Sequence, residues 1–325
     1  MSGPVGAGES REATGKPGGP PIQLVSEGHK VPFSKGLLAT ALTSTGLSPQ
    51  RAYAVALDVE WQLLEAAERE IRVEDLRRLV ETVLADSGEH RYLQRYRIWN
   101  RMAAEDRPVI VLIGGATGVG KSTIATQVAE RLGIVRIIST DSIREAMRAF
   151  FSETLMPSIH YSSYEASMAV RIPVGPGFDA GLLGFMEQVE MVAVGVLAII
   201  DRAIKERTSM VVEGVHMVPG MLAPRASEER MSDVLLLPLV VSVPDPALHR
   251  SHFLVREQQT SGRRVLARYL RGFDDIRKIQ GFILERATTE GTLVVDNVSI
   301  DDTVGTVVDA LYGVIEQTEV QAGER

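Results

Sequence analysis

An eight-residue glycine-rich segment constrains this chain more than any other feature. Residues 115–122 read GATGVGKS and match the phosphate-binding pattern G-x-x-x-x-G-K-[ST]. The glycines allow the backbone to turn its N–H groups toward phosphate oxygens, and the helix that follows presents its positive dipole end to the same anion. Lys121, a catalytic candidate, would reach the β- and γ-phosphates of a nucleotide, and the Ser122 hydroxyl would bind Mg²⁺. The nucleotide-binding candidates are Gly115, Ala116, Thr117, Gly118, Val119, Gly120, Lys121, Ser122 and Thr123.

The flanking sequence places this segment in an α/β fold. The apolar run at 109–113 has no polar interruption, which is typical of a strand covered on both faces of a parallel sheet. Four further strand candidates alternate with helical segments, at 135–139, 209–213, 234–243 and 292–296. Such alternation predicts βαβ units and a parallel sheet flanked by helices. A buried strand before the glycines and a helix after them disfavour the alternative of a glycine-rich turn that binds nothing.

Two carboxylates follow predicted strands, at the edge where open parallel sheets bind ligands. Asp141 comes just after the second strand, where it would orient an acceptor hydroxyl and take its proton; its alternative role is a helix N-cap. Glu213 ends the third strand, where it would hold Mg²⁺; the alternative is a carboxylate that faces solvent. For His216, the sequence leaves open whether it contacts a substrate or packs in the interior.

Residues 250–278 carry eight basic side chains against three acidic ones. Clustered arginines suit phosphate binding and neutralise the charge that develops on a transferred group, so this stretch is expected to form a lid. Arg263 and Arg264 are its catalytic candidates. An ordinary solvated helix face is the alternative. Nucleic-acid binding is disfavoured because the stretch holds few aromatic residues and the whole chain has a net charge of −7.

A hydroxyl-rich segment at 156–171 is the candidate for an acceptor site. It would line a pocket for a small polar anion; a plain loop before a capped helix is the alternative. The substrate-binding candidates are Asp141, Arg144, His160, Ser162, Ser163, Tyr164 and His216. Asn297, after the fifth predicted strand, would approach the adenine of a nucleotide or form part of a turn.

The length of 325 residues suits two domains. Residues 22–90 are expected to form a small, mainly helical domain with one strand near its start and helices that begin after Ser34, at Pro49 and after Val73. The second of these helices is expected to run to about Arg69. The remaining boundaries are a disordered tail at 1–21, a connecting helix at 91–106, the nucleotide-binding domain at 107–318 and a second tail at 319–325.

Composition excludes several function classes. The chain holds no Cys, which excludes a cysteine nucleophile, a disulfide framework and thiolate metal sites. Residues 1–21 lack the apolar run of a signal peptide. The longest apolar run, 191–200, is shorter than a membrane span and is interpreted as part of a buried helix, so we expect a cytoplasmic protein.

Several of these segments resemble the archaeal-type 2-phosphoglycerate kinases. The similar segments are LIGGATGVGKSTIA at 112–125, STDSIREAMR at 139–148, HYSSY at 160–164 and VEGVHMVPG at 212–220. The resemblance covers most of 107–318 and implies a P-loop kinase domain whose five-stranded parallel sheet has the strand order 2-3-1-4-5. It also implies that ATP, with Mg²⁺ as cofactor, phosphorylates the free hydroxyl of 2-phosphoglycerate to give 2,3-bisphosphoglycerate.

The segment 25–34, VSEGHKVPFS, resembles the start of an ATP-cone, a regulatory nucleotide-binding module in other proteins. Two other functions stay open: a kinase for another small hydroxylated acceptor such as a sugar acid, and a nucleotide-sensing regulator without turnover. The presence of both Asp141 and Glu213 disfavours the regulator, because a sensor needs no acceptor base. The expected partner is a small phosphorylated or hydroxylated molecule, with no nucleic acid or membrane, and the oligomeric state stays open.

Overall fold

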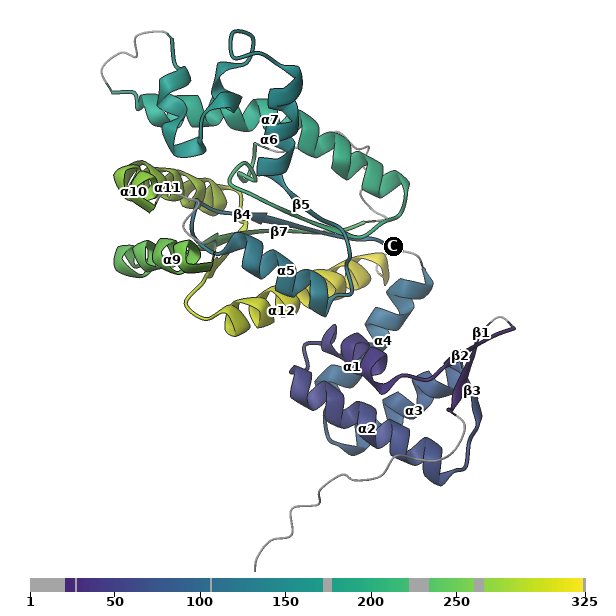
Figure 1. Cartoon of the computed structure of the whole chain (residues 1–325). Coiled ribbons are helices and arrows are strands. Elements are labelled where there is room, and N and C mark those ends of the chain that lie inside the picture. Colours follow the sequence, from purple (N-terminus) through teal and green to yellow (C-terminus); the bar gives the residue numbers. More distant parts are fainter. Residues whose placement is uncertain are drawn as a thin grey trace, which may run out of the picture.

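The structure is a computed structural model that describes residues 21–26, 28–105, 107–171, 177–221, 234–259 and 266–323. Residues 1–20 of the expected N-terminal tail lie outside these ranges, as do Arg263 and Arg264 of the expected lid. The described chain forms an N-terminal part and a larger α/β part, which adjoin at the helices α4 (His90–Ala104) and α12 (Ile300–Gly323) (Figure 1).

The N-terminal part combines a small sheet with four helices. Its strands are β1 (Gln23–Ser26), β2 (His29–Pro32) and β3 (Glu70–Arg72), in the order β2-β1-β3. Strand β1 is antiparallel to β2 and parallel to β3. The helices are α1 (Lys35–Thr43), α2 (Pro49–Glu65), α3 (Val73–Asp86) and α4 (His90–Ala104).

Local signals explain where these helices begin. The Ser34 hydroxyl accepts a hydrogen bond from the backbone of Leu37 at the start of α1. Ser48 caps α2 in the same way, and Pro49 occupies the first helical position, where its missing N–H costs nothing. The apolar stripe of α2 is buried, and consists of Ala52, Val55, Ala56, Val59 and Leu63.

Three features of this part differ from the expectation. The sheet has two further strands, β2 and β3, which are too short to produce a clear alternating pattern. Helix α2 ends at Glu65 rather than near Arg69, and Ala67 beyond it has a left-handed backbone with φ of 56°. Helix α4, expected as a connector, contributes the buried side chains of Leu93 and Tyr96 to the core of the N-terminal part.

The α/β part is built on a five-stranded sheet whose strands are all parallel. The strands are β4 (Val109–Gly114), β5 (Ile137–Ser139), β6 (Met210–Glu213), β7 (Leu235–Ser242) and β8 (Leu293–Asp296). Their spatial order is β5-β6-β4-β7-β8. Counted within this part alone, β4 is the first strand and the order reads 2-3-1-4-5; the chain-wide labels differ because three strands precede it.

Helices cover both faces of this sheet. The helices are α5 (Lys121–Arg131), α6 (Thr140–Phe150), α7 (Ala180–Lys205), α9 (Pro246–Gln259), α10 (Leu266–Arg271), α11 (Phe273–Thr289) and α12 (Ile300–Gly323), with 3₁₀ turns η1 (Pro157–His160) and η2 (Ser163–Ala169). Figure 1 shows α6 and α7 on one face and α5 and α12 on the other. Helix α12 continues to Gly323 and so includes most of the segment 319–325 that was expected as a tail.

Within the described ranges, α7 alone is long and apolar enough to cross a membrane, judged by length and composition. In this fold it packs against α6, α11 and the two 3₁₀ turns. Its side chains Val192, Val196 and Ile200 are buried against the sheet residues Ile110 and Leu112. The apolar run at 191–200 therefore belongs to a helix of the protein core.

Candidate active site

The glycine-rich segment forms a tight loop between β4 and α5. Gly118 and Gly120 have left-handed φ angles of 88° and 92°, which residues with a Cβ rarely adopt. A Cβ on Gly118 would lie 2.3 Å from the Phe253 ring, and one on Gly120 would lie 2.3 Å from Nδ2 of Asn297. Both positions thus require glycine for its backbone freedom and for its small size.

The residues that follow the loop lie beside a carboxylate from the neighbouring strand. The Lys121 ammonium donates to the Ala116 carbonyl at 2.7 Å, which curls the side chain back over the loop. The Ser122 hydroxyl donates to Oε1 of Glu213 at 3.0 Å. This contact arises because β6 pairs with β4 in a register that places Glu213 next to Ile113.

One cavity of about 1280 Å³ extends from this loop to the segment expected as an acceptor site. Thirteen of the candidate residues line it: Thr117, Gly118, Gly120, Lys121, Ser122, Thr123, Asp141, Arg144, Ser162, Ser163, Tyr164, Glu213 and Asn297. Gly115, Ala116 and Val119 belong to the loop but do not line the cavity. Two other candidates, His160 and His216, are placed elsewhere.

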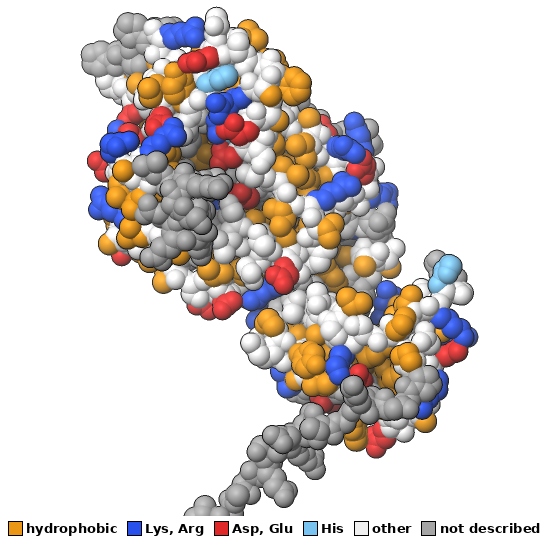
Figure 2. Space-filling model, in the orientation of Figure 1, with side chains coloured by type: hydrophobic (Ala, Val, Ile, Leu, Met, Phe, Trp, Pro, Cys, Tyr) orange, Lys and Arg blue, Asp and Glu red, His pale blue; other side chains and the backbone are white. Residues whose placement is uncertain are grey.

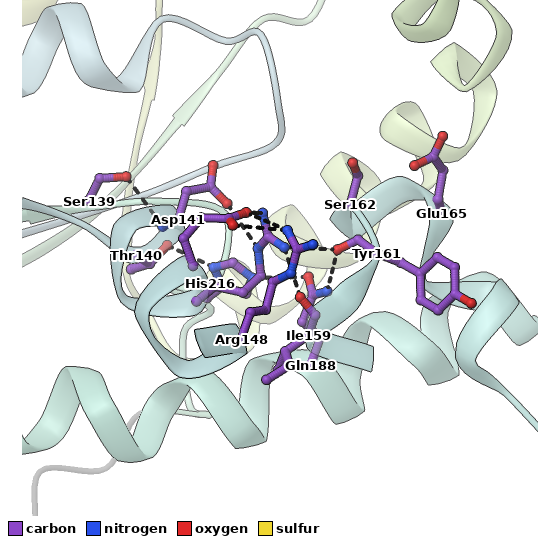
Figure 3. Close-up of polar contacts among 12 residues, drawn as sticks. Ser139, Thr140, Asp141, Arg148, Ile159, Tyr161, Ser162, Glu165, Gln188 and His216 are labelled. Atoms are coloured by element: carbon purple, nitrogen blue, oxygen red, sulfur yellow. Dashed lines mark hydrogen bonds and ion pairs between the residues drawn. The ribbon is translucent and has the colours of Figure 1, made fainter. Parts of the chain in front are cut away.

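Asp141 lies in the first turn of α6 with its side chain 68% exposed. The helix N-cap is Ser139, whose hydroxyl accepts from the Asp141 backbone at 3.3 Å, so the carboxylate itself is not the cap. Figure 3 shows Asp141 at this helix start, with Ser162 and Glu165 across from it. The carboxylate is therefore available to a group in the cavity.

Arg144 holds the segment expected as an acceptor site against α6. Its Nη1 donates to the carbonyls of Ile159 at 2.8 Å and Tyr161 at 3.3 Å. Its Nη2 donates to Glu145, and its Nε lies 3.5 Å from Oδ1 of Asp141. One guanidinium thus fixes the loop and places a positive charge beside the candidate base.

His216 is buried beneath α6 rather than exposed to the cavity. Its Nδ1 lies 2.8 Å from the Thr140 hydroxyl and its Nε2 lies 3.0 Å from Oε1 of Gln188 on α7 (Figure 3). The Gln188 amide nitrogen donates to two carbonyls, so Oε1 must accept, and the proton of His216 is on Nε2. Burial lowers the pKa of His216 to about 4, so the ring stays neutral.

The remaining acceptor-site candidates fall into two groups. His160 lies away from the cavity, with its Nε2 2.9 Å from the Phe151 carbonyl. Ser162, Ser163 and Tyr164 line the cavity, and the Ser162 hydroxyl accepts from Nη2 of Arg268 on α10 at 3.2 Å.

Among the arginines of the expected lid that the structure describes, Arg268 lines the cavity. It pairs with Glu165, and this hydrogen bond holds the pKa of the Glu165 carboxyl below its ordinary value. Arg268 belongs to the basic stretch 250–278, of which Arg263 and Arg264 were the expected catalytic residues. Only the fold shows that α10 places Arg268 opposite Ser162.

Two histidines of α9 were missed by sequence reasoning. His249 is fully buried and lies with Nε2 2.8 Å from the Thr117 carbonyl. His252 lines the cavity, with Nδ1 3.0 Å from the Gly118 carbonyl. The three-residue spacing, which places both rings on one helix face, was the signal available in the sequence.

The Mg²⁺ expected from the sequence fits the donors present. A hydroxyl and a carboxylate meet at Ser122 and Glu213, and both are the oxygen ligands that Mg²⁺ prefers. Among the residues that the structure describes, no three His, Asp or Glu side chains gather as a metal-binding cluster. The donor set therefore suits an ion that is shared with the phosphates of a nucleotide.

The α/β part carries a phosphate-binding loop on a sheet with the strand order 2-3-1-4-5. The strand-end carboxylate of Glu213 and the carboxylate of Asp141 face the same cavity. Together these features define a P-loop kinase. Comparison with family models agrees: residues 25–105 match the ATP cone domain and residues 94–171 match the zeta toxin family. Among solved structures, a gluconokinase from Sinorhizobium meliloti is similar at 15% identity and a TM-score of 0.39, covering 66% of this chain and 97% of that one.

Three curated relatives are similar over almost their whole length, and each is named 2-phosphoglycerate kinase. That of Methanothermobacter thermautotrophicus is 39% identical over 90% of this chain and 93% of its own. That of Methanopyrus kandleri is 37% identical over 88% and 86%, and that of Thermococcus kodakarensis is 36% identical over 90% and 96%. The chain belongs to the 2-phosphoglycerate kinase family.

Proposed function

We propose that this protein transfers the γ-phosphoryl group of ATP to the free hydroxyl of 2-phosphoglycerate and releases 2,3-bisphosphoglycerate and ADP. The observation that carries the proposal is the shared cavity. It brings the exposed carboxylate of Asp141 together with Lys121, Ser122 and Glu213. A nucleotide sensor without turnover would need the last three residues but not an acceptor base.

The transfer assigns a role to each of these groups. A bond forms between the acceptor oxygen and the γ-phosphorus while the bond to the β–γ bridging oxygen breaks, and the hydroxyl proton passes to Asp141. Lys121 and the loop N–H groups hold the phosphates in line with the acceptor. Ser122 and Glu213 would hold Mg²⁺, which would supply positive charge to the phosphates when bound.

The acceptor end of the cavity suits a small acid that carries a phosphate. Arg144 and Arg268 line this end, and both guanidinium groups match carboxylate or phosphate oxygens in geometry. The hydroxyls of Ser162 and Ser163 add neutral donors between them.

On the face of the molecule shown in Figure 2, Lys and Arg alternate with Asp and Glu rather than forming a basic stripe. This supports a small acceptor over a nucleic acid.

Phosphorus NMR tests this proposal directly. The purified protein with Mg²⁺ and ATP is given 2-phosphoglycerate, 3-phosphoglycerate or glycerate in separate reactions. We expect 2,3-bisphosphoglycerate from 2-phosphoglycerate alone. The Lys121→Ala variant is the control. We expect it to lower the rate of phosphoryl transfer by about 100-fold or more, because it removes one preorganised positive charge. ADP formation with none of the three acceptors phosphorylated would overturn the choice of acceptor.

A further inference from the structure

The carbonyl side of the phosphate-binding loop is held by side chains from distant parts of the chain. Three consecutive carbonyls each lie within hydrogen-bond distance of one ring or amide nitrogen. The three pairs are Thr117 with Nε2 of His249 at 2.8 Å, Gly118 with Nδ1 of His252 at 3.0 Å and Val119 with Nδ2 of Asn297 at 2.9 Å.

These contacts determine where the amide groups of the loop point. A trans peptide is planar, and its C=O and N–H groups lie on opposite sides of the chain. The carbonyls of residues 117, 118 and 119 point toward these three side chains. The N–H groups of Gly118, Val119 and Gly120 belong to the same three peptides and therefore point to the other side of the loop. Successive N–H groups on one side of a loop form an anion-binding concavity.

The protonation of His249 follows from its two partners. Nη1 of Arg277 lies 3.5 Å from Nδ1 of His249 and donates to the Val243 carbonyl at 2.7 Å. An arginine can only donate, so Nδ1 accepts and Nε2 carries the proton given to Thr117. Burial lowers the pKa of His249 to about 4, which keeps this neutral form.

The donor atoms of His252 and Asn297 also follow from their hydrogen-bond partners. The Gly118 carbonyl can only accept, so Nδ1 of His252 carries a proton. The Val119 carbonyl can only accept as well, so the Asn297 atom 2.9 Å from it is the donor Nδ2, and Oδ1 lies 3.3 Å from the Thr303 hydroxyl. Asn297 is itself 5% exposed, so its amide supports the loop from within the protein.

We propose that His249, His252 and Asn297 form a carbonyl clamp that orients three backbone N–H groups toward the phosphates of ATP before the nucleotide binds. They are positioning residues, because they act through the loop backbone. Donors that are already oriented need no reorganisation when charge develops during transfer. The inference rests on the proposed use of ATP and is independent of the identity of the acceptor.

A matched pair of substitutions at His252 tests the clamp. The amide nitrogen of Asn occupies about the place of Nδ1 in a histidine ring, whereas that of Gln occupies about the place of Nε2. His252→Asn therefore keeps the donor to Gly118, and His252→Gln removes it. We expect His252→Gln to weaken ADP binding by about tenfold or more, and His252→Asn to be clearly the milder variant.

The same two substitutions at His249, to Asn and to Gln, should affect ADP binding in the reverse order, because His249 donates through Nε2. There His249→Gln keeps the donor and should be the milder substitution, while His249→Asn should weaken ADP binding more. The measurement is the ADP dissociation constant of each full-length variant by calorimetry, with the melting temperature as a check on folding. His252 is only half-buried, so its pair remains informative if a His249 variant does not fold.

Each outcome decides the proposal. The crossed order, Asn milder at 252 and Gln milder at 249, supports the clamp, because loss of packing alone would not reverse with the position of the donor. Equal weakening by both variants at 252 would overturn it. Weaker binding by His252→Asn than by His252→Gln would also overturn it, and would assign direct nucleotide contact to Nε2. ADP binding by the wild type without transfer to 2-phosphoglycerate would reject the acceptor and leave this test intact.

Discussion

Asp141 and Arg144 lie one helical turn apart in the proposed acceptor site, and their surroundings differ. The Asp141 carboxylate is exposed to the cavity, while Arg144 is 11% exposed and anchors the loop carbonyls of Ile159 and Tyr161. The Arg144 guanidinium lies 3.5 Å from Oδ1 of Asp141 and places a positive charge beside the carboxylate. We propose that the carboxylate accepts the proton that the acceptor hydroxyl loses.

The role proposed for Asp141 predicts a specific kinetic change. Asp141→Asn removes the proton acceptor but keeps the shape of the side chain and the Ser139 cap of α6. We expect kcat to fall by about 100-fold or more, with little change in the KM for ATP. Steady-state kinetics with varied ATP and a fixed acceptor measures both. An unchanged kcat would leave the carboxylate without a catalytic role.

At the scale of elements, buried imidazoles connect the sheet to its helices. His216 follows β6 and contacts Thr140 at the start of α6 and Gln188 on α7. His249 connects α9 to the phosphate-binding loop. Both rings are neutral in the folded protein because burial lowers the pKa of each from about 6.5 to about 4. Packing between elements therefore depends on an uncharged state of these side chains.

This predicts a loss of stability in mild acid. Below pH 6.5 the unfolded chain binds protons on His216 and His249 that the folded chain does not bind, so stability is present above pH 6.5 and is lost as pH falls toward 4. Each histidine should contribute a slope of up to about 1.4 kcal/mol per pH unit. Urea unfolding between pH 6.5 and 5 measures it. His249→Gln should have a smaller slope than the wild type, and an equal slope would contradict the prediction.

At the scale of the whole molecule, α12 joins the two parts of the chain. Its N-terminal turn supports Asn297 through Thr303, and its middle contacts the N-terminal part. There Arg95 of α4 donates to Asp309 at 2.8 Å and to the Thr45 carbonyl at 3.1 Å, and stacks over the Tyr312 ring. One helix thus contacts both the ATP-cone part and the support of the phosphate-binding loop.

Arg91 and Arg95 both pair with Asp309 and allow a test of the contact between α4 and α12. Arg95 is 7% exposed and Arg91 is 57% exposed, yet both contact Asp309. Arg95→Ala should destabilise the protein by about 3 kcal/mol, because it removes a buried guanidinium that bonds to Asp309 and to the Thr45 carbonyl and stacks on Tyr312. Arg91→Ala should cost less than about 1 kcal/mol, as expected for an exposed pair. Calorimetric melting compares them. Equal effects would show that burial of Arg95 does not stabilise the junction.

The sequence by itself determined the phosphate-binding loop, the parallel sheet and the two strand-end carboxylates. Each depends on short-range information. A strand, three glycines and a helix start lie within one contiguous segment, and Asp141 and Glu213 lie just after and at the end of recognisable strands. Backbone preference and hydrophobic periodicity act over a few residues, so such features can be predicted without knowing how the chain packs.

Only the tertiary structure decided which side chains surround that loop. His249, His252 and Asn297 are separated from their loop partners by 132, 134 and 178 residues. Sequence reasoning assigned Asn297 to the adenine or a turn, and it left the role of His216 open. No local pattern distinguishes a histidine that binds substrate from one that holds a carbonyl, because the difference lies in which distant backbone group packing brings within 3 Å.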